Sequence, residues 1–97
     1  MKKFVLLYQG WGEGEPGPEL MQAWGAWFER VGEHMVDSGN PFGPGHELSP
    51  DGLRDLGAAT NPITGYSIVS VADLQAAEKL LDGCPSTSVL IYEAMPM

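Results

Sequence analysis

Histidine, carboxylate and tyrosine side chains are the groups whose chemistry suits proton transfer in this sequence. His34 precedes Asp37 by three residues, and we expect one helix over Pro18–Ser38, so the two side chains would share a side of that helix. An imidazole that is oriented by a carboxylate can act as a general base near neutral pH. The same residues also suit a solvated helix end, where the helix dipole stabilises a cation.

A second set of candidate acid–base and ligand-orienting residues lies in the apolar segments of the sequence. Tyr8, Tyr66 and Glu93 fall in three runs that we expect to be neighbouring strands. The two tyrosine hydroxyls could orient a bound carbonyl or carboxylate, and Glu93 could act as a base if burial raised its pKa. Alternatively, the tyrosines are amphipathic core or interface residues and Glu93 is an edge charge.

Tryptophans supply further candidate ligand contacts. Trp24 and Trp27 follow the apolar spacing of the expected helix and are typical of a core-facing stripe. Trp11 lies in the glycine-rich segment Gly10–Pro18, where it either closes a pocket like a lid or packs at a protein contact. We therefore predict that Tyr8, Trp11 and Trp24 bind a ligand.

Cofactor and metal motifs are missing from the sequence. His34 and His46, with a nearby carboxylate, would complete a two-histidine metal set, but their spacing matches no metal motif. Cys84 is the single cysteine, which excludes an internal disulfide and a cysteine-rich zinc site, and we expect it to be a small apolar residue rather than a nucleophile. We expect no cofactor and no bound metal.

Length and charge limit the classes of protein. The chain has 97 residues, which fits one domain over 1–97. Thirteen Asp and Glu against five Lys and Arg give a net charge of -8, which disfavours nucleic acid and anionic membrane surfaces as partners. No apolar run approaches the ~20 residues that cross a bilayer, and no cleavage site follows the short apolar N-terminus. We expect a cytoplasmic protein.

The pattern of apolar residues predicts an α+β fold. Strands and helices are expected in the order β-α-β-β-α-β, which is typical of a ferredoxin-like fold with a four-stranded antiparallel sheet and two helices on one face. The expected elements are Lys3–Gln9, Pro18–Ser38, Gly45–Leu48, Ile63–Val71, Leu74–Leu81 and Ser88–Ala94.

The last expected strand predicts a partner for the sheet. Val89–Tyr92 is continuously apolar, whereas a strand with one wet face should alternate. A second copy of the chain would cover the open face through a two-fold contact, which predicts a homodimer. The alternative is that this face carries scattered exposed apolar residues, as many proteins do.

Six segments carry a resemblance to a known family: Lys3–Tyr8, Trp24–Phe28, Val36–Pro41, Ile63–Val71, Ala72–Ala77 and Val89–Met95. Together they resemble the YCII-related family, including its DGPF-type branch, of the dimeric α+β barrel superfamily. The resemblance implies a ferredoxin-like dimer with a pocket between sheet and helices.

Taken together, these features predict a dimeric protein that binds a small organic molecule in a pocket between sheet and helices. If it is an enzyme, we expect cofactor-free acid–base chemistry of the lyase or isomerase type, carried by His34, Asp37, Tyr66 or Glu93. The alternative function is a non-catalytic accessory or protein-interaction module.

Overall fold

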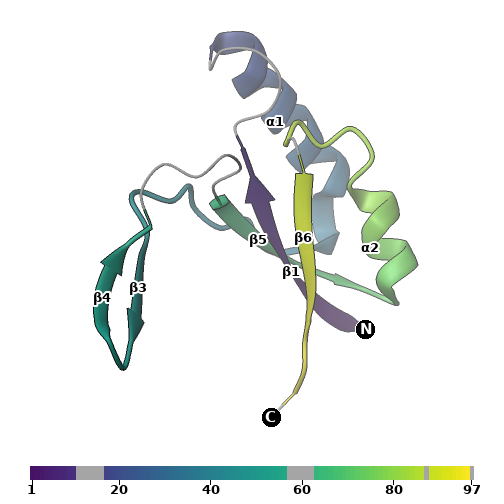
Figure 1. Cartoon of the computed structure of the whole chain (residues 1–97). Coiled ribbons are helices and arrows are strands. Elements are labelled where there is room, and N and C mark those ends of the chain that lie inside the picture. The colour runs from purple at the N-terminus through teal and green to yellow at the C-terminus, as the bar shows by residue number, and fades with distance from the viewer. Residues whose placement is uncertain (11–16, 57–62, 87, 97) are drawn as a thin grey trace.

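Two α-helices and a four-stranded antiparallel sheet form the body of the part of the chain that the computed structural model describes, which comprises residues 1–10, 17–56, 63–86 and 88–96. The strand order is β2-β5-β1-β6, and β3 and β4 form a separate two-stranded sheet (Figure 1). The elements are β1 (Lys2–Gln9), α1 (Pro18–Val31), the 3-10 turn η1 (Gly32–His34), β2 (Met35–Asp37), β3 (His46–Ser49), β4 (Gly52–Asp55), β5 (Ile63–Val71), α2 (Leu74–Leu80) and β6 (Ser88–Ala94).

The core lies between one face of the sheet and the two helices. Alternate residues of β1 and β5 are buried, because successive side chains of a strand point to opposite faces. Residues from both helices join the same cluster, so both helices cover the same face. The buried members are Phe4, Leu6, Tyr8, Trp27, Val31, Val69, Val71 and Ala77.

Helix α1 ends seven residues earlier than the sequence pattern predicts. Pro18 stands at its start, as expected, but Gly32 takes a φ of 56° and ends the α-helix. After the short turn η1 the chain extends into β2, where Met35 pairs with Val69 of β5. The prediction of one helix over Pro18–Ser38 is therefore wrong beyond Val31.

The second strand of the main sheet is also different from the one expected. The predicted strand at Gly45–Leu48 is present as β3, but it pairs with β4 in a hairpin outside the main sheet. Ser49–Gly52 forms the tight turn that its composition predicts, with the Asp51 amide donating to Ser49 Oγ over 3.2 Å. The place of the expected strand in the main sheet is taken by β2.

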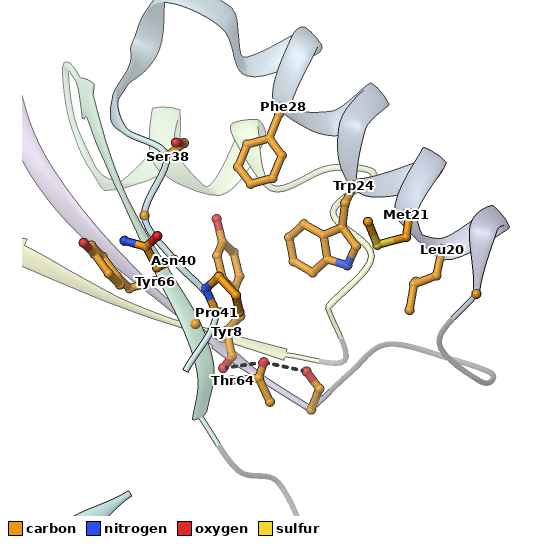
Figure 2. A pocket seen from close by; sticks show the side chains of 14 residues that line it. Tyr8, Leu20, Met21, Trp24, Phe28, Ser38, Asn40, Pro41, Thr64 and Tyr66 are labelled. Carbon is orange, nitrogen blue, oxygen red and sulfur yellow. Dashed lines mark hydrogen bonds between the residues drawn. The ribbon is translucent and has the colours of Figure 1, made fainter. Parts of the chain in front are cut away.

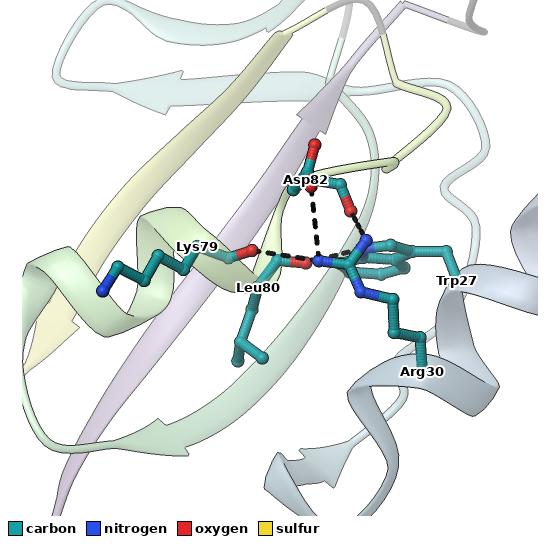
Figure 3. Close-up of polar contacts among 5 residues, drawn as sticks. All are labelled: Trp27, Arg30, Lys79, Leu80 and Asp82. Carbon is teal, nitrogen blue, oxygen red and sulfur yellow. Dashed lines mark hydrogen bonds and ion pairs between the residues drawn. The ribbon is translucent and has the colours of Figure 1, made fainter.

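Helix α2 is held at both ends. Its N-cap is Asp73, a residue type that is favoured at this position, and the Asp73 carboxylate accepts a hydrogen bond from the Ala76 amide at 2.8 Å. At its C-terminal end, Trp27 Nε1 of α1 donates to the Leu80 carbonyl at 2.7 Å (Figure 3). Arg30 donates to the carbonyls of Lys79 and Asp82. Side chains of α1 thus satisfy carbonyl groups that the end of a helix leaves unpaired.

Gly39 lies so close to β5 that a side chain at this position should destabilise the protein. Gly39 has a φ of 78°, and an added Cβ would lie 1.6 Å from the Tyr66 carbonyl oxygen. We expect Gly39→Ala to lower the free energy of unfolding by at least ~2 kcal/mol in urea denaturation.

Gly25→Ala is the matched control. A Cβ at Gly25 inside α1 would contact nothing within 4 Å. We expect this variant to be more stable by about 0.5–1 kcal/mol, since alanine favours the helix. Equal effects of the two substitutions would contradict the described backbone at Gly39.

Candidate functional site

A pocket of about 590 Å³ lies between α1 and the edge of the sheet (Figure 2). Its volume falls in the range of about 300–1,000 Å³ that is typical of small-molecule sites. Residues of α1 line one side, and residues of β1, β5 and the chain after β2 line the other. Sequence segments that are far apart therefore meet at this site.

The helical wall of the pocket is apolar. Leu20, Met21, Trp24 and Phe28 lie along one side of α1 at helical spacing. Trp27, one turn away from Trp24, points into the core instead and is fully buried. The apolar stripe of α1 is thus shared between the core and the pocket.

The opposite wall is the chain that follows β2. Its bend is fixed by the Gly39 amide, which donates to Asp37 Oδ1 at 2.8 Å. Pro41 then forms a β-bridge to Gly65, and the Phe42 amide donates to the Thr64 carbonyl at 2.8 Å. Backbone contacts to β5 therefore set this wall in place.

Aromatic rings form the inner end of the pocket. The Tyr8 ring meets the Trp24 ring edge to face, with centroids 4.9 Å apart and planes at 76°. The centroid of the Phe28 ring lies 5.9 Å from that of the Trp24 ring, and the centroid of the Trp27 ring lies 6.0 Å from that of Trp24. Edge-to-face contacts of this kind are favourable and limit the movement of each ring.

A buried chain of hydrogen bonds fixes Tyr8. Its hydroxyl donates to Ser67 Oγ at 2.7 Å, and Ser67 Oγ donates to the Ser38 carbonyl at 2.7 Å. Burial raises the pKa of Tyr8 well above its ordinary value, although its hydrogen bond with Ser67 lowers the pKa in part. Tyr8 is therefore a neutral phenol that positions groups, and it is not a base at neutral pH.

Two polar groups of the lining have no partner among the described residues. No hydrogen bond joins Trp24 Nε1 or the Asn40 side-chain amide to another residue that the structure describes. No charged side chain is part of the described lining. The pocket thus offers an apolar surface with an indole N–H donor that no other described residue engages, and an amide that can donate or accept.

The predicted pair of His34 and Asp37 does not share a helix side. His34 ends η1 and Asp37 ends β2, because the helix stops at Gly32. Asp37 lies instead beside Tyr66, whose hydroxyl is 3.5 Å from Asp37 Oδ2. The structure brings these two predicted residues together and leaves His34 outside the pocket lining.

Tyr8, Tyr66 and Glu93 lie on adjacent strands, as predicted, but their side chains are separate. Tyr8 points to the helix-covered face, while Tyr66 alternates to the other face and stacks on Phe42 with centroids 5.6 Å apart. Glu93 pairs in register with Phe4 and forms a 3.7 Å ion pair with Lys2, outside the pocket lining.

The remaining predicted residues have varied positions. Trp24 and Tyr8 both line the pocket, whereas Trp11 lies outside the described residues. His46 is in the β3–β4 hairpin, and no group of three or more His, Cys, Asp or Glu in the described ranges could hold a metal ion. Cys84 packs against the core, and burial raises the pKa of its thiol.

The wall from Ser38 to Pro41 is a part of the pocket that the sequence pattern does not predict, and the same is true of the lining residues Leu20, Met21 and Thr64. Gly39-Asn40-Pro41 has a composition typical of the end of a helix, but in the structure it belongs to this wall. Its position depends on β2, and three residues of strand are too short to give a periodic signal.

Comparisons with known proteins found no match: no protein-family model, no curated protein and no solved structure matches the chain. No helix in the described part of the chain is long and apolar enough to cross a membrane. The function is therefore argued from the pocket and the surfaces of this chain.

The buried hydrogen-bond chain predicts an order of mutational effects. Ser67→Ala leaves both the Tyr8 hydroxyl and the Ser38 carbonyl without a partner, whereas Tyr8→Phe removes one donor and leaves Ser67 bonded. We expect unfolding free energies lower by about 2–3 kcal/mol for Ser67→Ala and about 1 kcal/mol for Tyr8→Phe. Urea denaturation at pH 7 measures both values, and the reverse order would contradict the chain.

Tyr8 also predicts a pH dependence. Its pKa is raised from 10.0 in the folded protein, so the folded state holds the proton more tightly than the unfolded chain does. This contribution is complete below pH 10 and is lost as the pH rises above it. The stability difference between wild type and Tyr8→Phe, measured by urea denaturation from pH 8 to 11, should therefore shrink above pH 10. A constant difference would contradict the burial of an un-ionised phenol.

Proposed function

We propose that this protein binds a small, uncharged, largely apolar organic molecule between α1 and the sheet. The observation that carries the proposal is the pocket of about 590 Å³ with an apolar helical wall and a Trp24 N–H that has no partner among the described residues. An anionic ligand would find no cation in the described lining, and the chain as a whole carries a charge of -8. A planar molecule with one hydrogen-bond acceptor fits these surfaces best.

We propose cofactor-free acid–base chemistry of the lyase or isomerase type as a second step beyond binding, carried by Asp37 and Tyr66. These are the two predicted acid–base residues that lie together. Tyr66 borders the pocket, but its side chain points to the sheet face opposite Tyr8, and Asp37 is outside the described lining. The chemistry would therefore need a ligand that extends from the pocket to that face. His34 and Glu93 lie apart from this pair and have no part in the proposal.

Membership of the YCII-related family is part of the same proposal. The strand order β2-β5-β1-β6, with α1 and α2 on one face, supports the ferredoxin-like arrangement that the family resemblance implies. The β3–β4 hairpin is an addition to the six elements of that arrangement. Membership of this family would account for a pocket between the sheet and a helix.

The open face of the sheet supports a homodimer. Two cross-strand rows, each contributed by β5, β1 and β6, present apolar side chains away from the helices. The rows are Tyr66, Leu7 and Leu90, and Ile68, Val5 and Tyr92. A second copy could cover them through a self-complementary contact, and this surface also favours the alternative function of an interaction module.

The ligand proposal can be tested with a neutral fluorescent probe, N-phenyl-1-naphthylamine. We expect binding with enhanced fluorescence, and we expect Met21→Glu to weaken it at least about tenfold, because a charge would be placed against an apolar ligand. Met21 is 74% exposed, so the substitution should not unfold the protein.

Leu74→Glu is the matched control for the probe experiment. Leu74 is an apolar helical residue that is 55% exposed and lies outside the pocket lining. This variant should bind the probe as wild type does. Equal binding by wild type and both variants would refute the pocket as the site.

The homodimer has its own test in sedimentation velocity. Tyr92 is 59% exposed on the open face, so Tyr92→Lys should raise the dimer dissociation constant about tenfold or more without loss of folding. Leu74→Lys, on the helical side, should sediment as wild type. A wild-type chain that stays at its monomer mass of 10.4 kDa at millimolar concentration would contradict the dimer.

A further inference from the structure

The β3–β4 hairpin stands apart from the sheet and the helices (Figure 1). Its two strands pack mainly on each other, and its base is closed by the Leu56 amide, which donates to the Gly45 carbonyl at 3.0 Å. A two-stranded hairpin in water is marginally stable when nothing packs against it. We therefore use the residues on the two faces of the hairpin to infer which surface it contacts.

The two faces of the hairpin carry different pairs. Leu48 and Leu53 are direct cross-strand partners on one face, and they are 78% and 71% exposed. His46 and Asp55 are the next pair on this face, toward the base of the hairpin. Glu47 and Arg54 are partners on the other face, where Arg54 Nη2 lies 2.8 Å from Glu47 Oε1. The salt bridge suits a face in water, whereas a pair of exposed leucines marks a contact surface.

The chain is less compact than an average monomer of its size. It exposes 6985 Å², whereas a compact monomer of its mass exposes about 5,400 Å². Its radius of gyration is 14.6 Å, against about 12.5 Å for a compact chain of this length. A contact of the size that each partner buries in a stable homodimer would remove this excess of about 1,600 Å².

We infer that the Leu48–Leu53 face of each hairpin packs on the open sheet face of a second copy. This inference rests on the homodimer proposed above and adds a second contact to it. The contact is made by the β3–β4 hairpin, which we call the arm. One chain carries both apolar surfaces: the leucine pair, which the described residues leave exposed, and the open sheet face, where Tyr92 is exposed and the other members of the two rows are half-buried. A two-fold axis pairs each arm with the partner's sheet, so the contact closes at two copies.

The arm can be tested separately from the sheet contact. Leu48→Thr with Leu53→Thr removes apolar surface but keeps residues that favour strands. We expect the dimer dissociation constant of this double variant to rise tenfold or more in sedimentation velocity. The control, Glu47→Gln with Arg54→Gln on the charged face, should dimerise as wild type does.

Photo-crosslinking then identifies the surface that the arm contacts. A benzoylphenylalanine at position 53 in mixed ¹⁴N and ¹⁵N chains should give crosslinks between isotopically different chains, located on β1 or β6. A benzoylphenylalanine at position 47 should give no such crosslink. Crosslinks between chains on these strands, together with the weaker dimer, support the arm.

Two other outcomes overturn the inference in distinguishable ways. If Tyr92→Lys breaks the dimer while the leucine double variant keeps the wild-type dissociation constant, the sheet-to-sheet dimer holds and the arm is refuted. If wild type is monomeric, both the dimer and the arm fail, and probe binding in the pocket remains a separate result.

Discussion

The packing of Trp27 of α1 in the core, with its hydrogen bond to the C-terminal end of α2, is the contact on which the rest of the structure depends. Its ring is buried in the core while its Nε1 donates to the Leu80 carbonyl, so one side chain fixes the position of both helices on the sheet. With Trp27 directed inward, helical geometry directs Trp24 and Phe28 to the side, along the pocket. The orientation of α1 on the sheet therefore determines which of its side chains line the pocket.

Local patterns in the sequence were enough to predict most of the sheet and both helices. The alternation in β1 and β5 and the Asp73 cap of α2 are signals carried by adjacent residues. The end of α1 was not predictable in this way. Gly25 and Gly32 look alike in the sequence, but Gly32 alone takes a positive φ, and that choice depends on the pairing of β2 with β5.

The candidate site was predictable only in part, for the same reason. Tyr8 and Trp24 could be predicted as ligand contacts from their chemistry and spacing, and both line the pocket. The His34–Asp37 pair depended on a helix that does not continue, so it has no equivalent in the structure. The bond from Tyr8 to Ser67 joins residues 59 positions apart, and no short-range pattern reports such a contact.

The central claim is that a neutral, acceptor-bearing aromatic molecule binds against Trp24. Two-dimensional ¹H–¹⁵N NMR with assigned indole resonances tests it during titration with 1-naphthaldehyde, whose carbonyl can accept a hydrogen bond from the Trp24 N–H. The account predicts a saturable shift of the Trp24 indole resonance, while the Trp27 indole, which is bonded to the Leu80 carbonyl, moves little. A Trp24 resonance that does not move at millimolar ligand would contradict it.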